Sequence, residues 1–326
     1  MGQKMKEITD DEWSLVNPKN RSLTQEFLEQ QHLSPQTLKQ YTSALKIFFN
    51  WVYSNCENKA ITELKPRDAL RYQNFLLGKE LSSSAVKLKR SAVSSLCGFI
   101  ELYYSDEYPL FRNIYSKQIP NPPKTNKNEK KPLTKQELDH LINTLIHKEE
   151  FQMVAYINFS YWSGCRRSEA AQLKKEIVSY SKVVDKKTGN EKDYYQTHTI
   201  RCKGKGKEGL PRKLVFNDIV KESVQKWLDY RGEDDCEYVF VKKNKKTGET
   251  SPLAPSAFNY WCSEIFTEIV GRRVHPHQLR STRATHLVIY ENKDIKTAQA
   301  VLGHKSSETT EIYVVREDDE DVDAAF

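Results

Sequence analysis

Residues 275–313 read HPHQLRSTRATHLVIYENKDIKTAQAVLGHKSSETTEIY, and the interpretation of the whole chain begins with this stretch. Its first part contains His277 and Arg280, three residues apart. On a helix, this spacing places both side chains on one face. A single histidine–arginine pair of this kind is usually an ordinary surface pair, so it gains meaning only from the residues that follow it.

An apolar run ends in Gly303 and His304, and Tyr313 stands nine residues after that histidine. Gly303 suits the left-handed position that closes a helix. A new helix capped near Ser306 or Ser307 would carry Tyr313 on its second turn. Taken singly, these features also fit an ordinary helix end and an ordinary core tyrosine.

In this order and at this spacing, the features resemble the tyrosine recombinases of the phage integrase and Xer type. Members of that family carry H-x-L-R continued by A-T-H-L, then L-G-H, then the nucleophilic tyrosine. The matching segments here are residues 277–280, 284–287 and 302–304, followed by Tyr313. The resemblance implies a helical N-terminal core-binding domain and a mixed α/β catalytic domain, mainly helical with a small antiparallel sheet. It assigns catalytic roles to His277, Arg280, His304 and Tyr313.

The resemblance also implies an arginine in a G-x-R-x-S-E context upstream. An aromatic-rich apolar run from 153 to 162 breaks at Ser163 and Gly164, and Arg166 follows two residues after the glycine. Arg166 therefore matches the first catalytic arginine of the family. Arg167 occupies the variable position, and Glu169 matches the acid that supports the site.

A catalytic lysine is implied at the entrance of a β-hairpin. Residues 178–216 alternate as strands are expected to do, and the tip between them reads KGKGK at 203–207. The family pattern G-K-G selects Lys205. Because glycine and lysine alternate, Lys203 and Lys207 remain alternatives. A phosphate-binding loop is excluded, since no G-x-x-x-x-G-K-[ST] leads into a helix.

The charge of the chain favours a polyanionic partner. Basic residues number 51 and acidic residues 44, and six of the acids lie in the tail from Arg316 onward. A basic excess over the rest of the chain is typical of nucleic-acid binding, and we expect double-stranded DNA as the partner.

The six cysteines show neither C-x-x-C nor a Cys/His ligand spacing, so we expect reduced thiols, no metal and no other cofactor. No signal peptide is recognisable and no apolar run approaches 18 residues, which predicts a cytoplasmic protein without a membrane span.

Composition predicts four segments. Residues 1–20 read as a polar extension, and 21–116 as the helical core-binding domain. The stretch 117–131, with three prolines and five lysines, reads as a basic linker. Residues 132–326 form the catalytic domain with its tail.

Within the helical domain, helices are expected from Ser34-Pro35, from Pro66, and from Ser82–Ser84 to Tyr104, with Tyr103 on the buried face of the last. The residues proposed to contact DNA phosphates are Lys39, Lys87, Lys89 and Arg90.

The implied function is site-specific DNA recombination through a 3′-phosphotyrosine, as in the integration or excision of a phage or other mobile element. A tetramer acting on two DNA sites is expected, with the C-terminal tail from 314 to 326 docked on a neighbouring protomer. A non-enzymatic DNA-binding repressor on the same fold remains an alternative. A type IB topoisomerase is a third interpretation, which the short N-terminal half disfavours.

Overall fold

The computed structural model describes residues 5–31, 33–115, 119–123, 131–204, 209–244, 246–303, 307–311 and 314. The chain forms two compact units, one within residues 1–129 and the other within residues 130–203 and 210–326. In the described parts, no helix is both long enough and apolar enough to cross a bilayer. No group of three or more potential metal-ligating side chains was found among the same residues.

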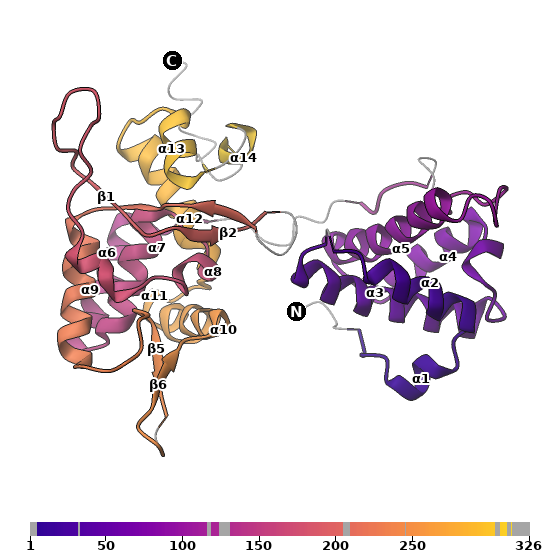
Figure 1. Ribbon diagram of the computed structural model, residues 1–326. Helices are drawn as coiled ribbons and strands as arrows, with labels where there is room; N and C mark the ends of the chain where they lie inside the picture. Colours follow the sequence, from indigo (N-terminus) through magenta and orange to yellow (C-terminus); the bar gives the residue numbers. More distant parts are fainter. Residues whose placement is uncertain are drawn as a thin grey trace. The chain divides into compact units, whose positions relative to one another are not determined.

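The N-terminal unit is helical (Figure 1). Its elements are α1 (Asp10–Ser14), α2 (Pro18–Leu28), α3 (Pro35–Asn55), η1 (Ile61–Glu63), α4 (Pro66–Gly78) and α5 (Ser83–Tyr103). The predicted start of α3 is confirmed, because the Ser34 side chain accepts a hydrogen bond from the Thr37 N–H and Pro35 occupies the first helical position. Ser82 caps α5 in the same way.

An aromatic core holds these helices together. Phe48, Phe49 and Tyr72 are fully buried, and the rings of Phe48 and Tyr72 meet edge to face at 4.9 Å. Tyr103 was expected on this buried face, but 64% of its surface is exposed. That expectation was wrong because the apolar periodicity of α5 continues into its last turn, where Ile100 already completes the buried stripe.

Residues on both sides of the predicted N-terminal domain pack with it, although their composition predicts an extension and a linker. The stretch predicted as a polar extension contains α1 and the beginning of α2, and Val16 between them is buried. At the other edge, Ile119 packs into the core of the unit, within the stretch predicted as linker. Arg90 donates hydrogen bonds to the backbone carbonyls of Ile119 and Pro120 at 3.3 and 2.7 Å. The domain boundaries at 20, 116 and 131 therefore stay predictions, and residues 124–130 lie outside the described part.

The C-terminal unit mixes helices with short strands. Its first half contains α6 (Lys135–His147), α7 (Phe151–Ser163), α8 (Arg167–Ala170), η2 (Lys175–Ser179), β1 (Tyr195–Gln196), β2 (Ile200–Cys202), β3 (Leu210–Arg212), β4 (Val215–Phe216) and α9 (Asp218–Arg231). Its second half contains β5 (Val241–Lys243), β6 (Thr250–Pro252), α10 (Pro255–Tyr260), η3 (Trp261–Phe266), α11 (Thr267–Val270), α12 (Pro276–Thr285), η4 (His286–Tyr290), α13 (Ile295–Leu302) and α14 (Ser307–Glu311).

Helix α7 forms the centre of this unit. Ten of its thirteen residues are buried, as expected for a helix that is apolar on every side. It contacts α6, α9 and α12, which surround it (Figure 1). The strands make three separate antiparallel pairs, β1 with β4, β2 with β3 and β5 with β6. In the second pair, Ile200 lies opposite Arg212. The central helix thereby presents its C-terminal end, at Ser163, to the elements that form the site.

Candidate active site

The turn after α7 positions the first arginine. Gly164 ends α7 with a φ of +59°, a conformation that glycine adopts without penalty. A Cβ atom at this position would also overlap the Leu302 side chain. The Ser163 hydroxyl accepts a hydrogen bond from the Cys165 N–H at 3.3 Å and steers the chain toward Arg166. The turn thus requires a glycine for both its backbone angle and the space it leaves.

Arg166 is held by Glu169. The Arg166 backbone adopts an extended conformation at the N-cap of α8, and its N–H donates to Glu169 Oε2 at 2.9 Å. The guanidinium Nη1 donates to Glu169 Oε1, also at 2.9 Å. The Glu169 side chain is wholly buried, whereas 28% of the Arg166 side chain is exposed. A buried carboxylate therefore fixes one edge of the guanidinium while part of the group remains open to a ligand.

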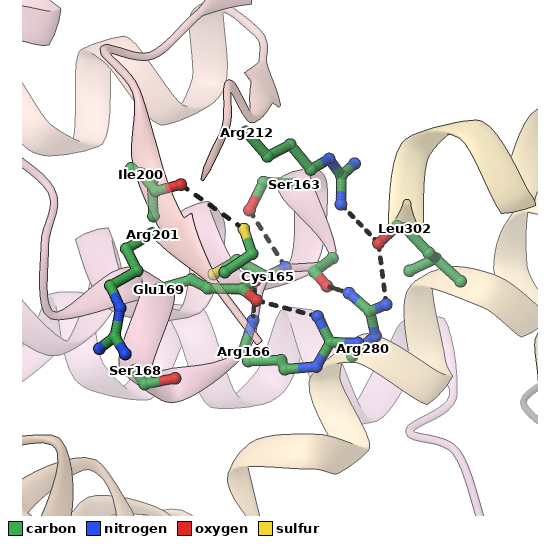
Figure 2. A network of polar contacts seen from close by, with 12 residues as sticks. Ser163, Cys165, Arg166, Ser168, Glu169, Ile200, Arg201, Arg212, Arg280 and Leu302 are labelled. Carbon is green, nitrogen blue, oxygen red and sulfur yellow. Dashed lines mark hydrogen bonds and ion pairs between the residues drawn. The ribbon is translucent and has the colours of Figure 1, made fainter. Parts of the chain in front are cut away.

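Arg280 approaches the same turn from α12. It is fully buried, and its guanidinium donates to the backbone carbonyls of Gly164 and Leu302, the latter at 2.8 Å. Figure 2 shows Arg166 and Arg280 lying beside one another around the turn. His277, one turn earlier on α12, is exposed. The structure therefore brings the two predicted arginines together and leaves the predicted histidine accessible on the same helix.

A third arginine joins this network, and sequence reasoning did not single it out. Arg212 on β3 donates hydrogen bonds to the carbonyls of Ala300 and Val301. It also donates to the carbonyl of Leu302, as Figure 2 shows. Nothing in the sequence marks it, because one arginine near a lysine-rich hairpin tip has no distinctive spacing. Its acceptors are backbone carbonyls about ninety residues further along the chain.

Several predicted residues lie outside the described part of the chain. They are Lys205 and its alternative Lys207, His304, Tyr313 and the tail from 315 onward. The flanking elements are described: β2 leads to an exposed Lys203, and Gly303 closes α13 with a φ of +66°. Helix α14 begins at Ser307, where a new helix is expected, and Ser306 lies outside the described part.

The thiols near the site are poor nucleophiles. Burial raises the pKa of Cys165 to about 12. Burial, together with the nearby Glu169 carboxylate, raises the pKa of Cys202 to about 11. Both side chains therefore remain protonated at neutral pH, so neither supplies a thiolate.

The side of α12 that carries Gln278 and Thr282 binds the beginning of the C-terminal unit, together with His286 at the start of η4. These residues recur every four positions and therefore share one side of the helix. Gln278 Nε2 donates to the Lys131 carbonyl at 2.6 Å, and the Thr282 hydroxyl accepts from the Leu133 N–H at 2.9 Å. His286 Nε2 lies 2.8 Å from the Leu133 carbonyl. The helix that carries Arg280 is thereby fastened to the segment 131–133.

The proposed phosphate contacts of the N-terminal unit differ in accessibility. Lys39 on α3 and Lys87 on α5 are exposed. Lys89 is half-buried, and burial lowers its pKa. Arg90 is engaged with the Ile119 and Pro120 carbonyls and lies over the Tyr115 ring at 5.1 Å. Lys39 and Lys87 are therefore the most available of the four.

Comparisons with known proteins identify the family of the chain. A model described as the phage integrase family matches residues 131–320, and one described as the phage integrase N-terminal SAM-like domain matches residues 21–100. The chain is 32% identical to the SPbeta prophage-derived recombinase-like protein YomM of Bacillus subtilis, over 99% of this chain and 95% of that protein. It is 30% identical to the tyrosine recombinase XerA of Pyrococcus furiosus, over 88% and 86% respectively.

A solved structure of the XerH site-specific recombinase bound to a palindromic difH substrate shares the fold. The TM-score is 0.67 at 17% identity, over 99% of this chain and 97% of that chain. The family model and the relatives place this helical unit and mixed unit among the DNA strand transferases of the tyrosine type. The chain belongs to the phage integrase family. The predicted family, fold class and function class, site-specific DNA recombination, are confirmed, and a non-enzymatic repressor is not favoured.

Proposed function

We propose that this recombinase cleaves a DNA strand by attack of the Tyr313 hydroxyl on a phosphodiester. The tyrosine oxygen bonds to phosphorus and forms a 3′-phosphotyrosine, while the bond from phosphorus to the 5′-oxygen breaks. The 5′-hydroxyl of a new strand then attacks the phosphotyrosine and releases Tyr313. Because one phosphodiester is exchanged for another, rejoining needs no nucleotide, metal or other cofactor.

The arginine pair around the Gly164 turn is the observation that supports this proposal most strongly. The transition state spreads negative charge over the non-bridging phosphate oxygens. Arg166 and Arg280 remain charged at any physiological pH, and a guanidinium can donate two parallel hydrogen bonds to such oxygens. Glu169 fixes Arg166, and backbone carbonyls fix Arg280, so both groups are oriented before a ligand arrives.

The remaining catalytic roles concern proton movement. A tyrosine hydroxyl has a solution pKa of about 10, so its attack benefits from a base, and His277 is our candidate. Lys205 would protonate the leaving 5′-oxygen, with Lys203 and Lys207 as the alternatives. His304 would donate a hydrogen bond to the phosphate.

Double-stranded DNA is the proposed substrate. The XerH relative was solved with its difH substrate, and the exposed Lys39 and Lys87 offer phosphate contacts on the N-terminal unit. We propose a tetramer acting on two sites in the cytoplasm. The prophage origin of the YomM relative supports integration or excision of a mobile element as the role.

Assembly would involve the C-terminal tail of a neighbouring protomer. The tail ends in apolar residues, Val322 and then Ala324-Ala325-Phe326. The C-terminal unit has a groove of about 550 Å³ between α6, α7 and α9, whose apolar lining includes Ile142, Ile146 and Phe151. We propose that this groove receives the apolar end of the partner's tail.

The nucleophile is tested by Tyr313→Phe, which removes a single hydroxyl. On a nicked suicide substrate, the wild type should accumulate a covalent protein–DNA adduct, and the variant should form none. Binding of the same DNA should persist, because the backbone contacts are unchanged. A phosphotyrosyl adduct recovered from the Tyr313→Phe protein would show that another residue is the nucleophile.

A further inference from the structure

The C-terminal end of α13 is held by two arginines from different elements. Arg212 reaches it from β3, and its Nη1 donates to the Leu302 carbonyl at 2.6 Å. Its Nη2 donates to the Ala300 and Val301 carbonyls at 3.2 and 2.5 Å. Arg280 Nη2 donates to the same Leu302 carbonyl at 2.8 Å. One backbone oxygen is therefore shared by a predicted catalytic arginine and an arginine without an assigned role.

The position of Arg212 matches an electrostatic requirement of the helix. The last carbonyls of a helix have no partner within it, and they carry the negative end of the helix dipole. A guanidinium at this end satisfies three of those carbonyls at once. Burial lowers the pKa of Arg212 from its ordinary value, but an arginine stays charged at neutral pH.

Gly303 leaves space for this arrangement. It closes α13 with a φ of +66°, and its N–H donates to the Gln299 carbonyl at 2.7 Å. A Cβ atom at position 303 would overlap the Arg212 guanidinium. The glycine therefore serves both the left-handed turn and the close approach of Arg212.

We propose that Arg212 is a positioning residue, which holds the end of α13 and thereby aligns Arg280 and the chain that leaves Gly303 for strand cleavage. The inference rests on the function proposed above, since it assigns Arg212 a part in that reaction. Arg212 would touch no substrate atom. It would act through the Leu302 carbonyl, which it shares with Arg280. Because β3 also forms one side of the hairpin with the candidate lysines, Arg212 would link that hairpin to the end of α13.

Arg212→Ala should slow single-turnover adduct formation on a suicide substrate by about 100-fold, as expected when a catalytic group shifts by about 1 Å. DNA affinity should stay within about 3-fold of wild type, because many other basic groups bind the backbone. Arg212→Lys should restore part of the rate, since an ammonium can satisfy some of the three carbonyls. In the DNA-free protein, the Gly303 amide should exchange its hydrogen faster in Arg212→Ala.

Arg231→Ala is the matched control. Arg231 also donates to backbone carbonyls, those of Cys236, Tyr238 and Val239, but it lies on α9 and contacts none of the candidate site residues that the structure describes. This variant should lose stability without slowing adduct formation below its melting temperature. Equal slowing by both arginine variants, in proportion to lost stability, would reduce Arg212 to a general structural role and overturn the inference.

Gly303→Ala provides a second route to the same conclusion. Alone, it should slow cleavage because the new methyl group displaces Arg212. Combined with Arg212→Ala, its additional effect should fall to what the left-handed backbone at position 303 causes by itself, since the overlapping partner is gone. If Gly303→Ala slowed cleavage by the same factor with and without Arg212, the inference would be contradicted. A wild-type protein that forms no adduct would refute the proposed function, whereas normal cleavage by both wild type and Arg212→Ala would refute only the role of Arg212.

Discussion

Glu169 uses both carboxylate oxygens on a single partner residue, one for the Arg166 backbone and one for its guanidinium. Burying a carboxylate costs several kcal/mol of desolvation, and a paired arginine offsets this only when the geometry is good. The gain from such a pair is therefore orientation more than stability. Arg166 keeps an accessible edge, and Glu169 determines where that edge points.

Arg166 is partly exposed and Arg280 is fully buried, and this difference in exposure leads to a test. Arg166→Lys should reduce the cleavage rate by about 100-fold or more, as for a lost oxyanion donor, with little change in melting temperature because the side chain is partly exposed. Arg280→Lys should reduce the rate and also the melting temperature, because one ammonium nitrogen cannot occupy the positions of both Nη atoms in this fully buried site.

The control is Arg167→Ala, which removes an exposed arginine that contacts the Asn259 side chain. Its cleavage rate, measured in the same single-turnover assay, should equal that of the wild type. If Arg167→Ala were the more damaging change, Arg167 would be the catalytic arginine of this loop instead of Arg166.

At the scale of single residues, the sequence predicts the arginines of the site but not the carbonyl groups that they bind. The motif around Arg166 points to Glu169, because a three-residue spacing across a helix start is local. The acceptors of Arg280 and Arg212 are carbonyl groups far away in sequence, and every residue has a carbonyl. No residue type could therefore mark Leu302 as their common partner.

Among the elements, the helix starts were the most predictable. The Thr134 capping box predicts a helix, and α6 begins there with the Thr134 hydroxyl and the Glu137 carboxylate each accepting a backbone N–H. The π-helical turns of η3 and η4 were not predicted, because their sequences fit ordinary helix. The attachment of α12 to residues 131–133 depends on tertiary contacts, and no periodic pattern in the sequence predicts it.

That attachment makes stability depend on pH. His286 lies between the Leu133 carbonyl and the Tyr161 hydroxyl, with the Lys135 and Arg283 cations and the Glu291 carboxylate close by. Burial lowers its pKa, so the folded protein holds it neutral. Between this lowered pKa and the ordinary value of about 6.5, the unfolded chain binds more protons than the folded one. Stability should therefore fall as the pH drops below about 6.5.

His286→Gln should flatten this dependence by up to about 1.4 kcal/mol per pH unit, the linkage of one proton. The measurement is the free energy of unfolding of the C-terminal unit between pH 5 and 8. Some slope should remain, because burial also lowers the pKa of His275. The exposed His140→Gln serves as the control and should keep the wild-type slope. An unchanged slope in His286→Gln would mean that the pKa of His286 is the same in the folded and the unfolded protein.

At the scale of the whole molecule, composition predicted a helical unit and a mixed unit in the observed order. The boundaries at 20 and 116 stay predictions, and packing adds a residue outside each of them to the N-terminal core. Val16 and Ile119 belong to the N-terminal core although their surroundings are polar or proline-rich. Two isolated apolar residues carry no periodicity, so packing alone reveals where they belong.

The acidic tail belongs to this scale, because its proposed partner is a second protomer. Deleting residues 317–326 should leave binding to a half-site intact and weaken cooperative assembly on a full site. Ile142→Asp, which places a charge in the proposed groove, should have the same effect, and the two changes together should add little to either alone. Sedimentation of the protein–DNA complexes would measure this.

The matched control is Val184→Asp, which alters an apolar residue that is 55% exposed outside the groove. It should assemble normally. If the truncated protein assembled and recombined like the full-length chain, the tail would have no part in assembly.

The attachment of residues 131–133 to α12 also has a mechanical consequence. Any force transmitted along the chain from the N-terminal unit enters the C-terminal unit through Lys131, which Gln278 and Arg272 hold. The next attachment is at Leu133, one and two helical turns further on, at Thr282 and His286. A pull would therefore load these hydrogen bonds in succession along the helix that carries Arg280.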